Sequence, residues 1–273
     1  MKKILISDFT TKEMPHGGSE WVNQVLIDKF NLEFMYSSEV TSFDKNNFYI
    51  ISNVSLMNPM LVRQIPTLNY IIIENDYKIC HSRHPWRWEN SIIPANERIN
   101  YDLYEKAKAV FVQSTDHLNV YKANQVNGCF KNLNCSIWDE SDLQLLETVL
   151  KNNPNKIDKC AIYGTDNWIK NTPGAIKFCE DNNLEYELVT NKEKRIDFLS
   201  ELAKYKRLVF LPIARETFCR LVVDAKSLGL EVITTKNYGA VLETWYDELS
   251  GQDLINFLRR QSQFNIKKIS NYI

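Results

Sequence analysis

Short apolar runs alternate with amphipathic segments through the first half of the chain. The runs have strand length and are rich in isoleucine and valine, whereas the segments between them repeat their apolar residues at helical spacing. The pattern predicts strands at 3–9, 33–37, 47–52, 68–73 and 109–113, and helices at 18–30, 59–65, 100–107 and 115–124. Alternation on this scale is typical of a parallel sheet with helices on both faces. The predicted fold class is therefore α/β.

The same alternation returns in the second half of the chain. The predicted elements there are strands at 159–164, 208–211 and 231–235, and helices at 173–181 and 218–228. The strand at 208–211, the helix at 218–228 and the strand at 231–235 form a βαβ unit, and Gly229 stands where a glycine commonly ends a helix. We therefore expect a second Rossmann-like domain.

The segment 151–155 is the best candidate for a linker, because its Pro and Asn residues interrupt both periodicities. This placement predicts a first domain over 1–150, a second over 151–255 and a terminal helical segment over 256–273. If two such domains face each other across a cleft, ligands belong in the crevice at the carboxyl ends of their strands.

Composition narrows the class of protein. The net charge is -1 with acidic and basic residues mixed, so the chain as a whole is not steered toward nucleic acid or anionic membrane. Six cysteines occur without a CxxC pair, which favours reduced thiols in a cytosolic protein. No signal-type run begins the chain, and no apolar stretch approaches the ~18 residues of a membrane span. We expect a cytoplasmic protein without stable membrane insertion. Peripheral contact with a membrane surface is left open. If the chain is encoded by a virus, the compartment is the cytoplasm of the host.

Two carboxylates border the helix at 218–228. Glu216 lies just before it and Asp224 lies two turns later, so the two side chains can address different parts of one ligand. The surrounding segment 206–239 resembles the donor-binding half of retaining, nucleotide-sugar-dependent glycosyltransferases with the GT-B fold (glycosyltransferase family 4). Their hallmark is Glu, seven residues, Glu, then a small-Gly-x-Pro-Val-Ile strand. The resemblance implies that Glu216 lies near the transferred sugar and that Asp224 holds the ribose hydroxyls.

Further positions of the donor half match or depart from the family pattern. Phe218 occupies the aromatic position after the first carboxylate, and Cys219 replaces a glycine whose amide approaches the diphosphate. Lys170 matches one member of a basic pair that neutralises the diphosphate, whereas Thr165 stands where the arginine is expected. Arg220 or Arg215 is a candidate for the missing cation, since the start of a helix beside phosphates accepts an Arg from several positions.

The first domain also carries parts of the resemblance. The segment from His16 to Glu20 resembles the family's Gly-Gly-x-Glu loop, in which Gly17 and Gly18 would let the backbone approach the diphosphate. Asp76 follows a buried strand at the edge where the family places a His-Asp pair against the transferred sugar. The alternative for Glu74 and Asp76 is a cap or a surface ion pair.

The loop from Cys80 to Trp88 supports two interpretations. Its Cys and His side chains do not predict a metal site, because they lie within five residues of each other and lack a distant partner. Its arginines and two tryptophans suit stacking on a sugar or base with phosphate contacts, whereas a packed loop with the Trp side chains in the core explains them equally well. Ser114 or Thr115 is most simply a helix N-cap.

Together these features predict a glycosyltransferase, hexosyltransferase-like, that moves a sugar from a nucleotide diphosphate sugar to an acceptor hydroxyl. The resemblance implies retention at the anomeric carbon, no essential metal or cofactor, and a terminal helix that packs back on the first domain. A UDP-sugar donor is favoured and a GDP-sugar is left open. A glycan or lipid-linked acceptor is favoured over a DNA base. The alternative is a nucleotide-sugar or nucleotide binding protein without transferase activity, because Thr165, Cys219 and Asp224 depart from the pattern.

Overall fold

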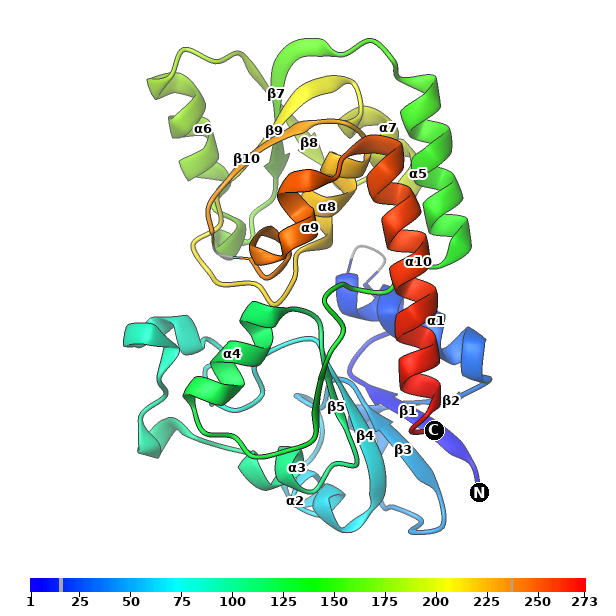
Figure 1. Cartoon of the computed structure of the whole chain (residues 1–273). Helices are drawn as coiled ribbons and strands as arrows, with labels where there is room; N and C mark the ends of the chain where they lie inside the picture. The colour runs from blue at the N-terminus through cyan, green and yellow to red at the C-terminus, as the bar shows by residue number, and fades with distance from the viewer. Residues whose placement is uncertain (15–16, 237) are drawn as a thin grey trace. The chain divides into compact units, whose positions relative to one another are not determined.

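The structure, a computed structural model, describes residues 1–14, 17–236 and 238–273. The chain divides into two compact units, which are described separately (Figure 1). Unit 1 is Met1–Ile137 with Ser262–Ile273, and unit 2 is Trp138–Gln261. The division by contacts thus falls after Ile137, whereas the sequence places the boundary near residue 150.

Unit 1 is built on a parallel sheet of six strands in the order β2-β1-β3-β4-β5-β6. Its strands are β1 (Lys3–Ser7), β2 (Glu33–Tyr36), β3 (Phe48–Ile51), β4 (Asn69–Glu74), β5 (Val110–Val112) and β6 (Phe130–Asn132). Its helices are α1 (Gly18–Phe30), α2 (Pro59–Val62), α3 (Tyr101–Glu105) and α4 (Thr115–Ala123). The five strands and four helices expected for this half are confirmed to within a few residues at each end, and β6 was not predicted.

Alternate residues of the strands pack into two separate hydrophobic cores, one on each face of the sheet. Ile4, Ile6 and Ile72 pack in one cluster, whereas Leu5 and Ile71 pack in the other. This is why the central strands read as continuous apolar runs: a parallel sheet covered on both faces needs an apolar side chain at every position. Ile269, from the last residues of the chain, packs in the second cluster.

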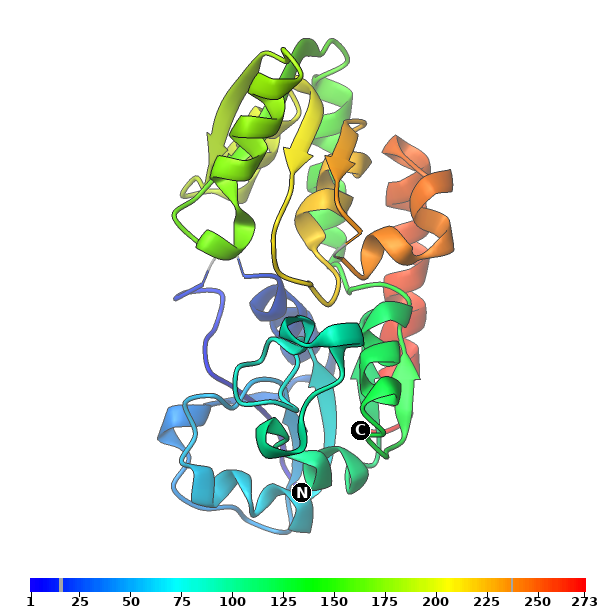
Figure 2. The same ribbon diagram turned by 90° about the vertical axis from the view of Figure 1, so that its left-hand side faces the viewer.

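Unit 2 is built on a parallel sheet of four strands in the order β10-β9-β7-β8. Its strands are β7 (Ile157–Gly164), β8 (Tyr186–Thr190), β9 (Tyr205–Phe210) and β10 (Glu231–Thr234), and its helices are α5 (Glu140–Asn152), α6 (Thr172–Asp181), α7 (Arg195–Leu202), α8 (Arg220–Ser227) and α9 (Thr244–Glu248). Figure 2 shows α6 lying over this sheet. The long helix α10 (Gly251–Ser270) begins in unit 2 (Figure 1). There the Arg259 side chain donates hydrogen bonds to Glu140 and Glu147 of α5.

Local sequence signals explain several of these boundaries. The Ser114 hydroxyl accepts a hydrogen bond from the His117 N–H at 3.0 Å, which confirms the predicted N-cap of α4. Gly229 has a φ of 77°, the left-handed conformation expected of a glycine that follows a helix. The predicted βαβ unit is therefore formed by β9, α8 and β10, as the pattern indicated.

Candidate functional site

The carboxyl edge of the unit 2 sheet has a switch point between β7 and β9. From β7 the chain passes to β8 on one side of the sheet and later to β9 on the other side, and open α/β sheets bind ligands at such points. Lys170 comes from the loop after β7, and Glu216 from the loop after β9. The two loops are joined by backbone bonding, since the Ile213 N–H donates to the Ile169 carbonyl at 3.1 Å.

Lys170 and Glu216 form an ion pair at this edge. The Lys170 Nζ lies 2.6 Å from the Glu216 Oε1, and the two side chains are 28% and 18% exposed, so both can still be reached by a ligand. Burial disfavours the charged form of Lys170, but neighbouring groups, the Glu216 carboxylate first among them, together outweigh burial and raise the pKa of Lys170. Lys170 is therefore a fixed cation. The Glu216 backbone is held in turn by the Gly239 N–H, which donates to its carbonyl at 3.0 Å.

Cys219 adopts a backbone conformation that favours glycine. Its φ of 74° and ψ of 88° at the N-cap of α8 place it in the left-handed region, where a side chain is strained. The resemblance expects a glycine at this position, and the backbone keeps the conformation of one although the residue has changed. Burial, with a further contribution from Glu216, raises the pKa of the Cys219 thiol, so the thiol stays neutral beside the Lys170 and Glu216 pair.

Phe218 belongs to the core of unit 2. Its side chain is 1% exposed and lies between Trp138 and Trp245, with ring centroids 5.9 and 6.3 Å away. Its carbonyl accepts the Ala240 N–H at 3.1 Å. The aromatic ring therefore anchors the loop that carries Glu216, and the part expected of Phe218 in nucleotide binding stays a prediction.

Asp224 and Arg220 lie in a buried network of charges in unit 2. The Arg195 guanidinium donates to Asp142 at 2.8 Å and to Asp224 at 2.9 Å, and Arg220 donates to the other Asp142 oxygen at 2.6 Å. Trp138 donates its indole N–H to Asp224 at 3.3 Å, and the Arg220 guanidinium lies 4.5 Å from the Trp138 ring centroid. Asp224 is 2% exposed. Both of its oxygens are thus engaged inside the unit, and its expected role toward ribose stays a prediction.

Neither Arg195 nor Asp142 was singled out in the sequence. They are separated by 53 residues and belong to no motif, so no spacing indicates that they meet. Thr165, at the position where the resemblance expects an arginine, is half-buried after β7, and its N–H donates to the Thr172 hydroxyl at 3.2 Å. It contributes a backbone turn and no charge.

In unit 1 the sheet has its own switch point, between β1 and β3. The Gly17 and Gly18 pair begins α1 there, and His16 lies outside the described residues. A Cβ on Gly17 would lie 1.9 Å from the Glu20 Oε2, so the close approach that this glycine permits is taken up by an internal carboxylate. Burial raises the pKa of Glu20, and the nearby Asp8 acts in the same direction.

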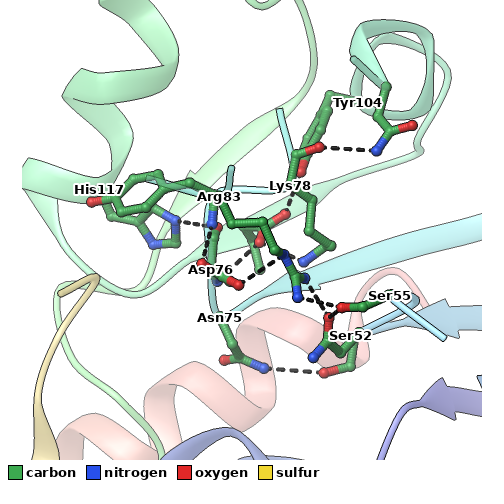
Figure 3. Close-up of polar contacts among 12 residues, drawn as sticks. Ser52, Ser55, Asn75, Asp76, Lys78, Arg83, Tyr104 and His117 are labelled. Atoms are coloured by element: carbon green, nitrogen blue, oxygen red, sulfur yellow. Dashed lines mark hydrogen bonds and ion pairs between the residues drawn. The ribbon is translucent and has the colours of Figure 1, made fainter. Parts of the chain in front are cut away.

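Asp76 follows β4 at the carboxyl edge of the unit 1 sheet and is partly exposed. Its Oδ2 lies 3.0 Å from the Arg83 Nε (Figure 3), and its carbonyl accepts a hydrogen bond from the Tyr121 hydroxyl at 3.1 Å. Glu74, in contrast to Asp76, is fully buried. It forms an ion pair with Lys78 and accepts a hydrogen bond from the Tyr104 hydroxyl at 2.7 Å. The ion pair weighed in the sequence is therefore present for Asp76, and its catalytic role stays a prediction.

Protonation of His117 is expected to be coupled to unfolding. Its Nδ1 accepts the Gln113 N–H at 3.4 Å, so its Nε2 is the donor to the Asp76 carbonyl at 3.1 Å. Burial lowers the pKa of His117 from 6.5 to about 3. Below pH 6.5 the unfolded chain binds a proton that the folded chain does not, so the stabilisation is present above pH 6.5 and is lost as the pH falls toward 3.

The measurement is the free energy of unfolding at pH 7.5 and pH 5 for the wild type and His117→Gln. At ~1.4 kcal/mol per pH unit for one proton, the wild type should lose about 2 kcal/mol more than the variant. His81→Gln, at an exposed histidine, is the control and should behave as the wild type. Equal losses in the wild type and His117→Gln would contradict the assignment.

Within residues 1–14, 17–236 and 238–273, no cluster of three or more His, Cys, Asp or Glu side chains could hold a metal ion. In the same residues, no helix is long and apolar enough to span a membrane.

Comparison with known proteins gives matches in structure and none in sequence. No protein-family model and no curated protein sequence matches this chain. The solved structure of HepE from Anabaena in complex with UDP matches 95% of this chain and 89% of HepE, with a TM-score of 0.52 and 10% identity. HepE in complex with UDP and glucose matches 96% of this chain and 89% of HepE, with a TM-score of 0.50 and 10% identity. AviGT4, a glycosyltransferase involved in avilamycin A biosynthesis, matches 100% of this chain and 97% of its own at 12% identity, with a TM-score of 0.46 that is too low to carry an argument.

At 10% identity the likeness to HepE extends to the fold alone. It covers nearly the whole of both chains, so it includes both parallel sheets together with their helices. The predicted fold class is confirmed: the chain is an α/β protein with two parallel-sheet units, the architecture of the GT-B glycosyltransferases.

Proposed function

We propose that this protein is a glycosyltransferase that takes a sugar from a nucleotide diphosphate sugar. The observation that carries the proposal is the ion pair between Lys170 and Glu216 at the switch point of unit 2. These residues lie 46 positions apart, and the resemblance to the GT-B family assigns one to the diphosphate and the other to the transferred sugar. The fold supports the same class, and HepE, which shares it, has been solved with UDP.

The chemistry follows from what transfer requires. When the sugar leaves, negative charge develops on the departing phosphate oxygen, and a fixed cation with oriented amide groups stabilises it. Lys170, whose raised pKa keeps it charged, is a cation of this unit that meets the first requirement. The backbone at Cys219, the N-cap of α8, supplies the amide groups. Glu216 orients the sugar hydroxyls. Asp76 of unit 1 is the candidate for contact with the reacting sugar.

The finer assignments are parts of the same proposal. The donor is a UDP-sugar, a choice supported by the UDP bound to HepE, and GDP is the outcome to test against it. Transfer occurs with retention, in the manner of a hexosyltransferase, and without an essential metal, as the resemblance implies. The acceptor is a glycan or a lipid-linked sugar in preference to a DNA base, and the reaction takes place in the cytoplasm.

One observation favours a second candidate, a nucleotide or nucleotide-sugar binding protein without transferase activity. Asp224 and Arg220, two residues expected to hold the nucleotide, are bound to Arg195 and Asp142. An assay of product release distinguishes the two candidates, because only a transferase releases UDP from a UDP-sugar such as UDP-glucose.

The donor prediction is tested by calorimetry and thermal shift with UDP, GDP and their sugar conjugates, with and without a divalent metal. We expect UDP to bind, and Lys170→Ala to weaken its binding by about tenfold to a hundredfold, because a charge-assisted bond to phosphate is lost. Lys177→Ala, at an exposed lysine of α6, is the matched control and should bind as the wild type. Unchanged UDP affinity in Lys170→Ala would remove the support for this site.

A further inference from the structure

A cavity of about 680 Å³ opens in unit 1, and one of its lining residues, Arg83, pairs with Asp76. It lies between the segment that runs from the end of β3 into α2 and the segment that follows β4. Its apolar lining residues are Val54, Met57, Pro59, Val62 and Ile99. A cavity of this size, largely apolar with a few polar groups, is typical of a small-molecule site.

The lining of the cavity also includes basic side chains. These are Arg63, His81, Lys78 and Arg83, with Asp102 as the acidic residue among the lining. Lys78 is 3% exposed and pairs with the fully buried Glu74, so it offers a ligand little accessible surface. Arg63 and His81 are exposed, and no ion pair involves either of them among the residues that the structure describes.

Arg83 is held in place before any ligand arrives. Its Nε pairs with Asp76 at 3.0 Å, its Nη2 donates to the Asn53 Oδ1 at 2.5 Å and its Nη1 donates to the Ser55 hydroxyl (Figure 3). A guanidinium has a second N–H on each Nη atom, so donors remain for a ligand. The Arg83 backbone is left-handed with a φ of 56°, a strained conformation that tends to persist where a side chain must be positioned.

We propose that this cavity binds the phosphate group of an anionic ligand, with Arg63 and Arg83 as the ligands of the phosphate. Two guanidinium groups beside one cavity suit a phosphate, because each donates paired N–H groups to its oxygens. The apolar lining residues receive the remainder of the molecule. Burial raises the pKa of the Cys80 thiol, which lines the cavity as a neutral group.

If the proposed transferase function holds, the ligand of this cavity is the acceptor, which therefore carries a phosphate. Two sources share that chemistry. One is a soluble sugar phosphate, whose ring would contact the apolar lining residues, and the other is a prenyl phosphate, whose hydrocarbon chain would contact them. Phosphate binding in unit 1 does not depend on the donor, so the two proposals can fail separately.

The test uses the whole chain and three probes, inorganic phosphate, glucose 1-phosphate and geranyl phosphate, each titrated by ³¹P NMR. We expect at least one phosphomonoester to bind, and Arg63→Gln to raise its Kd by about tenfold or more, since a hydrogen bond to a charged group is lost. The matched control is Arg260→Gln, at an exposed arginine of α10 in unit 2 that does not line the cavity. Tighter binding of geranyl phosphate than of glucose 1-phosphate identifies the lipid source, and the reverse order identifies the sugar.

Three outcomes would overturn the proposal. The first is that no probe binds the wild type, and the second is that Arg63→Gln and Arg260→Gln have the same affinity. The third is loss of phosphate binding in Lys170→Ala, which would place the phosphate in unit 2. Phosphate binding that survives in a chain unable to bind UDP would instead leave this cavity standing and remove the proposed function.

Discussion

Glu216→Gln should lower the turnover of UDP-glucose by about a hundredfold to a thousandfold while changing the affinity for UDP by much less. The substitution keeps the shape of the side chain and removes its charge. It therefore breaks the pair with Lys170, at 2.6 Å, and weakens the bonds that a carboxylate makes to sugar hydroxyls. Such bonds matter most as positive charge develops on the sugar, so the loss falls on the chemical step. The measurement is the rate of UDP release from UDP-glucose, with UDP binding measured separately.

Glu231→Gln is the matched control for this variant. Glu231 is a carboxylate of the same unit, exposed at the start of β10 and 3.4 Å from Arg207, and its loss should leave turnover unchanged. Wild-type turnover in Glu216→Gln would remove Glu216 from the mechanism. If the wild type binds UDP yet releases none from any of a panel of UDP-sugars, with a range of acceptors supplied, the chain is a binding protein.

The sheets were largely predictable because their central strands are buried on both faces. β4 contains Ile71, Ile72 and Ile73 in succession, and a run of that kind has few alternatives to a central parallel strand. β6 was missed because Phe130–Asn132 contains one apolar residue and none of its positions is fully buried. β6 is a strand because its backbone pairs with β5. Its side chains show no pattern that predicts an edge strand.

The candidate site was predictable only where a motif carries it. Lys170 and Glu216 were found through the family resemblance, and the topology of the sheet brings them together at the switch point. The partners of Asp224 and Arg220 could not be found in this way. Arg220 reaches across 78 residues to Asp142, and the identity of a partner at that distance depends on how α5 packs on α7 and α8. Two residues assigned to the ligand by local sequence are thus engaged by tertiary contacts.

This network accounts for the second large effect that we expect. Asp142→Asn should destabilise unit 2 by about 3 to 5 kcal/mol, the usual result of removing one partner from a buried ion pair. Asp142 is 6% exposed in its side chain and holds Arg195 with one oxygen and Arg220 with the other. An amide offers one oxygen and turns an N–H toward the second guanidinium. One of the two buried guanidinium groups then loses the carboxylate oxygen that accepts its hydrogen bond.

The loss is measured by denaturant unfolding, and hydrogen exchange locates it, because α5, α7 and α8 should lose protection while the sheet of unit 1 keeps it. Asp181→Asn is the control: this carboxylate is exposed and pairs with Lys177 one turn away on α6, where an ion pair is worth about 0.5 kcal/mol or less. Equal stability of the two variants would mean that water reaches Asp142. The network would then be open enough for Asp224 to turn toward a ligand, which would return it to the ribose role that the sequence implies.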